Sequence, residues 1–176
     1  CFVAGPKALY DFVDNNPSIL ILDGRYVNDP YVIGQNDNQV SINATLEVDV
    51  TGQCCSESIG SRQWSGTGGQ VDTVLGAQLS RGGRSFIALY STAMVRNPVT
   101  GVKEEISTIV PQLKPGAVVT TGRNDVHYIV TEYGAVNLRG CSVRERVEKL
   151  ISIAHPKFRD QIRKESIALG LLPAEH

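Results

Sequence analysis

SIGSRQWSGTGGQVD, at residues 58–72, joins a strand-like run to a helix-like run through a glycine-rich turn. Its glycines, Gly66, Gly68 and Gly69, permit positive φ angles and let a ligand approach the main chain closely. Amide groups left free at the start of a helix carry a partial positive charge that suits a phosphate or a developing oxyanion. The stretch therefore predicts an anion site, and the alternative is a purely structural turn between strand and helix.

The segments next to this turn predict both strands and helices. Apolar residues have helical spacing over residues 70–79, directly after the glycines. Upstream, residues 40–50 alternate between apolar and polar side chains, which predicts a half-buried strand with Val40 and Ile42 facing inward. Residues 53–59 follow a turn and are expected to form the hairpin partner of this strand.

The N-terminal part continues the mixed pattern. A helix is expected over residues 7–15, a buried strand over residues 19–22, and a short helix through Gly34 that Asn28 caps. Four later runs are expected to be strands, at residues 85–90, 106–113, 117–121 and 126–131. An exposed, hairpin-like loop is expected near residues 97–101.

The C-terminal part is expected to be helical. Ser142 and Glu145 have the spacing of a capping box, which opens a helix to about Ala154. Pro156 starts another helix that stops near Gly170. Hairpin strands mixed with helices predict an α/β domain with a mixed sheet flanked by helices.

Composition limits the class of protein. A chain of 176 residues with 41% hydrophobic and 20% charged residues suits a single soluble domain. The net charge of −1 does not favour binding to nucleic acid or to an anionic membrane surface, so an anion site must be local. No apolar run approaches the length of a membrane span and no signal peptide is evident, so we expect a cytoplasmic protein.

Cysteine and histidine positions suggest no metal site and no disulfide framework. The four cysteines form no C-x-x-C pair, and the three histidines are scattered. We expect free, mostly buried thiols; a nucleophilic Cys54 or Cys55 is the alternative, although no His or Asp is placed to activate either. The chain starts at Cys1 and its single methionine is Met94, so we expect it to be part of a longer protein.

Eight short words occur in a characteristic order along the chain. They are YDFVDNNP (10–17), NDN (36–38), VSIN (40–43), EVDVTGQ (47–53), GTGGQ (66–70), IVPQLKPG (109–116), TEYG (131–134) and ISIAHP (151–156). Together they closely resemble the C-terminal domain of the 4-hydroxybutyrate CoA-transferase / acetyl-CoA hydrolase-transferase family, from about residue 5 to about residue 171. The resemblance implies a CoA-transferase (NagB/RpiA-like) fold, with residues 1–176 as a single C-terminal domain and the N-terminal half of the enzyme absent.

The resemblance also implies a reaction. CoA moves from an acyl-CoA to a small carboxylate, of the acetate, butyrate or 4-hydroxybutyrate type, through an acyl-glutamyl anhydride and a glutamyl-CoA thioester. In the family the attacking glutamate follows a histidine and a serine, just upstream of where this chain begins, and no such motif occurs here. CoA is thus expected as a substrate without a metal, and the N-terminal half of the enzyme and further copies in a homo-oligomer as partners.

The same resemblance assigns roles to individual residues. The oxyanion donors are the amides of Gly68 and Gly66 and the side chain of Asn28, for which a helix cap or a turn beside Pro30 is the alternative. The residues expected to contact CoA are Gly69, Gln70, Arg62, Lys114 and Arg123. For each of the three cations, solvated surface charge is the alternative.

Some positions depart from the family pattern. Thr67 stands where a small apolar residue is usual, Tyr90 where proline is common, and residues 96–105 form a slightly enlarged loop. Two other functions stay open: an acetyl-CoA hydrolase on the same scaffold, with water as the acceptor, and a non-catalytic CoA-binding or interaction domain.

Overall fold

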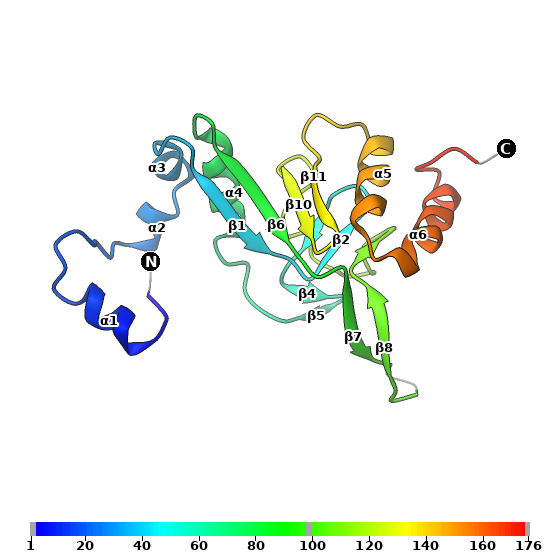
Figure 1. The fold of residues 1–176 in the computed structure, drawn as a ribbon, viewed down its shortest axis with the longest axis horizontal. Coiled ribbons are helices and arrows are strands. Elements are labelled where there is room, and N and C mark those ends of the chain that lie inside the picture. The colour runs from blue at the N-terminus through cyan, green and yellow to red at the C-terminus, as the bar shows by residue number, and fades with distance from the viewer. Residues whose placement is uncertain (1–2, 98–99, 175–176) are drawn as a thin grey trace.

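The computed structural model describes residues 3–97 and 100–174. Its largest sheet has the strand order β1-β6-β10-β11 (Figure 1). These strands are β1 (Val40–Ala44), β6 (Arg84–Ala88), β10 (Tyr128–Thr131) and β11 (Gly134–Asn137). β6 pairs in parallel with β1 and β10, whereas β11 is antiparallel to β10. This confirms the predicted α/β class with a mixed sheet.

Smaller sheets accompany this one. One has the order β3-β2-β9, and two are antiparallel pairs, β4–β5 and β7–β8. Their strands are β2 (Glu47–Asp49), β3 (Cys54–Cys55), β4 (Ser58–Ile59), β5 (Arg62–Gln63), β7 (Thr92–Arg96), β8 (Lys103–Ser107) and β9 (Ile109–Val110). The β7–β8 ribbon projects away from the remainder of the domain (Figure 1). The predicted hairpin loop joins these two strands, and residues 98–99 of it lie outside the described residues.

The described residues form six helices. They are α1 (Lys7–Val13), α2 (Gly24–Val27), α3 (Pro30–Gly34), α4 (Gln70–Leu79), α5 (Val143–Ile153) and α6 (Pro156–Ala168). The predicted capping box is present at the start of α5, where the Ser142 side chain accepts from the Glu145 amide and the Glu145 side chain accepts from the Ser142 amide. Pro156 occupies the first turn of α6, as predicted.

The hydrophobic core is shared by this sheet, the β3-β2-β9 sheet and the helices α4, α5 and α6. Ile87 of β6 and Ile129 of β10 are fully buried against a cluster that includes Val74 of α4 and Val147 and Leu150 of α5. Because α4 and α5 both pack on the face that carries Ile87 and Ile129, one face of the sheet forms the core. Burial of these aliphatic side chains is the main source of the domain's stability.

The alternating run at residues 40–50 departs from the prediction in one respect. Ser41 is buried and Ile42 is 75% exposed, so the inward and outward faces of β1 are the reverse of those expected. The run also breaks into β1 and β2, and in its second half the apolar residues Val48 and Val50 are buried, as expected. Alternation distinguishes two faces of a strand but not which one a helix covers. Here α4 covers the face of Asn43, whose side chain donates to Thr73.

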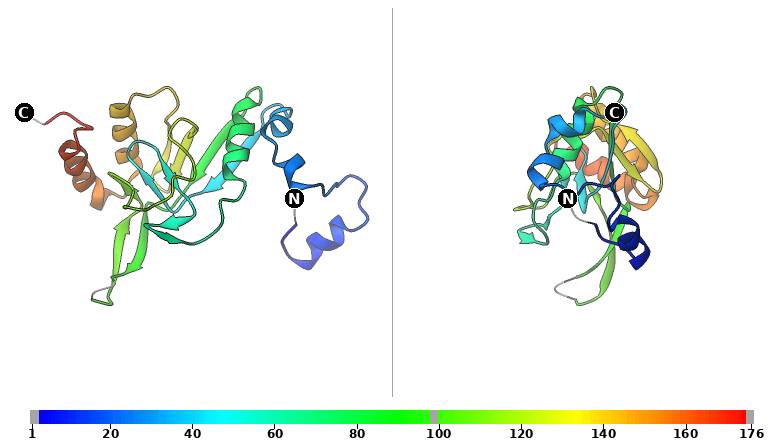
Figure 2. Two further views of the ribbon diagram at one scale, coloured as in Figure 1. Left: turned by 180° about the vertical axis from the view of Figure 1, so that it is seen from behind. Right: turned by 90° about the vertical axis from the view of Figure 1, so that its left-hand side faces the viewer.

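The predicted buried strand at residues 19–22 is wrong. These residues form no strand, and Leu20 and Ile21 are 75% and 55% exposed. They belong to an N-terminal segment that stands apart from the domain, and its helix α1 contains no buried residue (Figure 2). An apolar run becomes a strand only when a partner strand and a covering layer are available, and the described residues provide neither here.

Two other predicted segments are shorter than expected. The run at residues 106–113 contributes only the end of β8 and the two residues of β9. Residues 117–121 make a single antiparallel bridge, between Thr121 and Cys54. The predicted strand at 85–90 corresponds to β6, and that at 126–131 corresponds to β10.

Candidate active site

The glycine loop, defined as residues 64–69, connects the hairpin β4–β5 to α4. α4 runs opposite in direction to β6, the strand that follows it. The N-terminus of α4 therefore lies near the carboxyl edge of the parallel strands, where open α/β sheets bind ligands. A hydrogen bond of 3.1 Å from Asn43 Nδ2 of β1 to Thr73 Oγ1 fixes the first turn of α4 there. The glycine loop therefore lies at the sheet edge where open α/β folds bind ligands.

The loop leaves its backbone accessible. Gly68 has a φ of +61°, which disfavours any residue with a Cβ. A Cβ placed on Gly66 or on Gly68 would meet no atom within 4 Å. Gly69 is the N-cap of α4 and makes no side-chain cap hydrogen bond, so no cap side chain occupies the first amides of this helix. Free amides at an open helix start suit an anion or an oxyanion.

Asn28 lies directly beside this loop. A Cβ placed on Gly69 would be 2.7 Å from Asn28 Nδ2, so the side-chain amide of Asn28 is in contact with the main chain of Gly69. Asn28, Asp72 and neighbouring residues of α2 and α3 line an open pocket of about 490 Å³. The structure thus brings together Asn28 and the glycine loop, which lie far apart in the sequence.

The prediction that Asn28 caps the helix through Gly34 is wrong, although Asn28 is the C-cap of α2. Asp29, one residue later, is the N-cap of α3, and its Oδ1 accepts from the Tyr31 amide at 2.8 Å. Asn28 instead ends α2, and its backbone N–H donates to the Gly24 carbonyl. Across residues 3–97 and 100–174, its side chain makes no hydrogen bond that would occupy the amide. The Nδ2 group is available as a donor.

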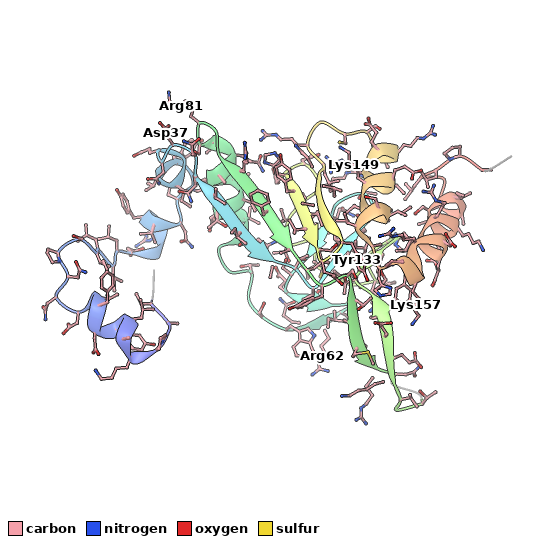
Figure 3. All side chains as sticks on the ribbon, in the orientation of Figure 1. Asp37, Arg62, Arg81, Tyr133, Lys149 and Lys157 are labelled. Carbon is pink, nitrogen blue, oxygen red and sulfur yellow. The ribbon has the colours of Figure 1, made fainter. Side chains whose placement is uncertain are left out.

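Arg62 and Lys114 lie on adjoining segments. Arg62 begins β5, and its exposed side chain extends away from the sheet (Figure 3). Lys114 follows β9, and a Cβ on Gly60, in the β4–β5 turn, would be 3.9 Å from Lys114 Cβ. Lys114 Nζ also pairs with Glu47 at 3.7 Å. Burial raises the pKa of Glu47, and the nearby lysine only partly offsets this effect.

The other two predicted CoA ligands are placed differently. Arg123 has an exposed side chain, and its carbonyl accepts from Arg146 Nη1 of α5 at 2.9 Å. Gln70 is only 8% exposed, and its Nε2 donates to Thr121 Oγ1 at 2.9 Å. Because this side chain is buried and hydrogen-bonded within the protein, Gln70 presents little of its side chain to a ligand.

Sequence reasoning missed two residues at the loop. Trp64 is 59% exposed, and the Arg62 guanidinium lies 5.0 Å from the centre of its ring. Side chains two residues apart in an extended segment lie on the same side, so the spacing of Arg62 and Trp64 could have indicated that they are neighbours. Glu57 is 4% exposed, and its carbonyl accepts from the amides of Trp64 and Ser65 at the start of the loop. Nothing in the local pattern shows that it is buried.

A second, more apolar pocket opens at the carboxyl edge of the sheet. It has a volume of about 500 Å³ and is lined by Ala44, Ala88, Tyr90, Val130 and Glu132, among others. Glu132 accepts from Ser91 Oγ at 2.6 Å. Burial acts to raise the pKa of Glu132, but the hydrogen bonds from the Ser91 side chain and amide outweigh it and lower the pKa.

The two adjacent cysteines do not suit a nucleophilic role. Cys54 and Cys55 are free and fully buried, as expected, and burial together with the nearby Asp49 carboxylate raises the pKa of the Cys54 thiol far above its ordinary value.

Within the described part of the chain, no group of three or more His, Cys, Asp or Glu side chains is arranged to hold a metal ion. Among the same residues, every helix is too short or too polar to span a membrane.

Known proteins are similar to this chain in sequence and in fold. Residues 5–166 match the family described as acetyl-CoA hydrolase/transferase C-terminal domain. The chain is 52% identical over 164 residues to the 4-hydroxybutyrate coenzyme A transferase of Clostridium kluyveri, covering 93% of this chain and 36% of that protein. It is 54% identical over 161 residues to the succinyl-CoA:cyclohexane-1-carboxylate CoA transferase of Geobacter metallireducens, covering 92% and 35%.

Solved structures give the same answer for the fold. The crystal structure of RipA from Yersinia pestis matches with a TM-score of 0.84 and 46% identity, over 96% of this chain and 36% of that one. The chain thus spans a little over a third of the length of these relatives. The family match covers nearly all of the chain, including the glycine loop and Asn28, and this chain belongs to the acetyl-CoA hydrolase/transferase C-terminal domain family.

Proposed function

We propose that this chain is the C-terminal domain of an enzyme that transfers CoA between an acyl-CoA and a small carboxylate of the acetate, butyrate or 4-hydroxybutyrate type. The contact of the Asn28 amide with Gly69, at the open start of α4, is the observation that carries this proposal. The contact supports the proposal because a side-chain donor beside backbone donors can stabilise negative charge on a carbonyl oxygen during acyl transfer.

The proposed reaction is a double displacement. A glutamate carboxylate supplied from outside these 176 residues attacks the thioester carbonyl and expels the CoA thiolate, which leaves an acyl-glutamyl anhydride. The thiolate then attacks the glutamyl carbonyl, which forms a glutamyl-CoA thioester and releases the first carboxylate. A second carboxylate attacks this thioester, and the same two steps in reverse form the new acyl-CoA. Each attack places negative charge on a carbonyl oxygen, and the amides of Gly66 and Gly68 with Asn28 Nδ2 are its proposed donors.

The CoA molecule itself requires further contacts. We assign its phosphates to the cations Arg62, Lys114 and Arg123, and to the backbone amides of Gly69 and Gln70 at the helix start. The exposed Trp64 ring, with Arg62 beside it, adds a flat surface on which the base can stack. The N-terminal half of the same enzyme closes the site, and the intact enzyme is a homo-oligomer.

A hydrolase is the second candidate, because the description of the matching family names both activities. In that case water replaces the second carboxylate, and the same oxyanion donors serve the hydrolytic step. The two reactions differ in a single measurable property, which is the need for an acceptor acid.

The test uses the full-length enzyme with acetyl-CoA, first with butyrate or 4-hydroxybutyrate and then without any carboxylate. A transferase forms the new acyl-CoA, shows ping-pong kinetics and accumulates a glutamyl-CoA adduct that mass spectrometry detects. Free CoA released at the same rate without an acceptor assigns the hydrolase instead. If the enzyme neither transfers CoA nor hydrolyses acetyl-CoA, both candidate functions are contradicted.

A further inference from the structure

The start of the glycine loop is held by Glu57. The Glu57 carbonyl accepts from the amides of Trp64 and Ser65, at 2.7 and 3.2 Å. Its carboxylate accepts from Thr120 Oγ1 at 2.9 Å and from Gln63 Nε2 at 3.2 Å. The same Gln63 group donates to the Ser65 carbonyl at 2.6 Å. A single buried acidic residue thus joins the first residues of the loop to Thr120.

The end of the loop is anchored by the residue that follows it. Gln70 directly follows Gly69, and its Nε2 donates to Thr121 Oγ1 at 2.9 Å. Thr121 is 1% exposed, and its carbonyl accepts from the Cys54 amide at 3.0 Å. The Thr120 amide in turn donates to the Cys54 carbonyl at 2.9 Å. Because Cys54 is part of the core, Thr120 and Thr121 provide a fixed base for both ends of the loop.

Between these two ends the loop has little support of its own. The positions of a Cβ on Gly66 and on Gly68 are empty to 4 Å, and Trp64 is 59% exposed. A segment without side-chain packing keeps its shape only through its ends. Oxyanion donors act only when they are fixed before the reaction, so the position of the ends decides the position of the amides.

The chemistry of Glu57 supports a positioning role. A buried carboxylate is costly unless it is hydrogen-bonded, and no cation pairs with Glu57 among the residues that the structure describes. Each of its oxygens accepts one bond from the segments that it joins. Bonds to a charged acceptor are stronger than neutral ones, which suits a residue that must fix an otherwise unsupported loop.

We infer that Glu57 and Gln70 are positioning residues, which anchor the two ends of the glycine loop on Thr120 and Thr121 and so hold its backbone amides in place for the reacting carbonyl. The inference rests on the proposed function for its effect on turnover. The anchoring itself is independent of that function, and it can be measured separately.

Three variants of the full-length enzyme test it. Glu57→Gln and Thr120→Val weaken the first anchor from opposite sides, so that failure of one variant to fold does not end the test. Thr121→Val removes the acceptor of the second anchor. Ser166→Ala is the matched control, because it also removes a buried side-chain hydrogen bond, from Ser166 Oγ to the Ile162 carbonyl in α6, far along the chain from the loop.

The first readout is amide hydrogen exchange at Trp64 and Ser65, which needs no activity. Loss of one part-buried side-chain hydrogen bond in Glu57→Gln or Thr120→Val should loosen residue 57, whose carbonyl accepts from both amides, and speed this exchange about tenfold relative to the wild type. Ser166→Ala should leave the exchange unchanged. Unchanged exchange in both first-anchor variants would overturn the inference. Faster exchange in an enzyme whose wild type transfers no CoA supports the anchoring and contradicts only the proposed function.

The second readout separates positioning from general stability. All three anchor variants should lower kcat about tenfold while KM for the acyl-CoA stays within about twofold, because misplaced donors weaken transition-state binding more than substrate binding. Ser166→Ala should keep both constants. If the wild type is active and the anchor variants keep its kcat per folded enzyme, the role of Glu57 and Gln70 in positioning is overturned.

Discussion

The side-chain amide of Asn28 touches the main chain of Gly69, where an added Cβ would be only 2.7 Å from Asn28 Nδ2. Glycine at position 69 is therefore required by a neighbour and not by a strained backbone, since its φ of −102° is open to any residue. The contact joins the end of α2 to the start of α4. It brings the side-chain amide of Asn28 to the C-terminal end of the glycine loop.

This contact predicts coupling between Asn28 and Gly69. Gly69→Ala should displace the Asn28 amide and lower kcat of the full-length enzyme about as much as Asn28→Ala does, by about 10²-fold if one oxyanion donor is lost. The double variant should be no worse than either single variant, because both remove the same interaction. Steady-state kinetics of the four enzymes measures this. Additive losses would show that the two residues act separately.

The Asn28 variant has a second expected property. Because Asp29 rather than Asn28 caps α3, Asn28→Ala should change the melting temperature by no more than a few degrees. Asp29→Ala is the matched comparison, and loss of its cap should cost about 1 kcal/mol. Thermal unfolding of both variants provides the measurement. A larger loss in Asn28→Ala, with full activity of the folded fraction, would assign Asn28 a structural role.

Gly68 should be sensitive for two reasons that a control can separate. Gly68→Val places a Cβ at a φ of +61°, which costs about 1–2 kcal/mol of stability, and it disturbs an oxyanion donor worth about 10²–10³ in rate. Gly140→Val meets the same backbone strain at a φ of +73° and equally open space, but outside the loop. Both variants should lose stability, and only Gly68→Val should lose turnover. Equal activities of the two folded variants would remove Gly68 from the site.

Arg62 should act on CoA rather than on its acyl group. Arg62→Ala in the full-length enzyme should raise KM for acyl-CoA about tenfold, as expected for loss of one charge-assisted contact, and leave kcat nearly unchanged. An acyl-pantetheine thioester, which lacks the nucleotide, should show no such change. Arg81→Ala, an exposed arginine paired with Asp37 at the other end of α4, is the control and should alter neither constant. Equal effects on both thioesters would contradict the assignment to the nucleotide.

The 176-residue chain should fold by itself but transfer no CoA. Its core is contributed by its own strands and helices, whereas the attacking glutamate is expected to lie outside it. A two-part site that lacks one part also loses contacts and exclusion of water, so affinity for CoA should be weak. The purified chain is assayed with acetyl-CoA and butyrate beside the full-length enzyme. A covalent adduct on a glutamate within residues 1–176 would place the nucleophile in this chain.

Glu132 predicts a pH dependence of stability. Hydrogen bonds from Ser91 outweigh burial and lower its folded pKa below the ordinary value of 4.5, so the folded state binds this proton less tightly than the unfolded state. The resulting stability is present above the ordinary pKa and is lost as the pH falls through the lowered one. Because Glu132 is exposed, the contribution should stay below about 1 kcal/mol. Denaturant unfolding of the wild type and Glu132→Gln should differ in pH slope only in this acidic window.

Much of this protein follows from local sequence alone. The Ser142 capping box, the helical spacing after Gly69 and the β-rich runs at β6 and β10 each depend on neighbours within a few residues, and each was predicted correctly. The order of the matched words was enough to identify the family, because it depends on residue identity and not on geometry.

Long-range packing decided the rest. Which face of β1 is buried depends on where α4 lies, the apolar run at 19–22 has no partner strand in the described residues, and Asn28 meets Gly69 only because α2 ends beside α4. Sequence periodicity reports the local backbone period, whereas burial and contact depend on which distant segment covers a residue. The sequence by itself therefore determined the family, the class of fold and the glycine loop, and only the tertiary structure decided which side chains surround that loop and hold it.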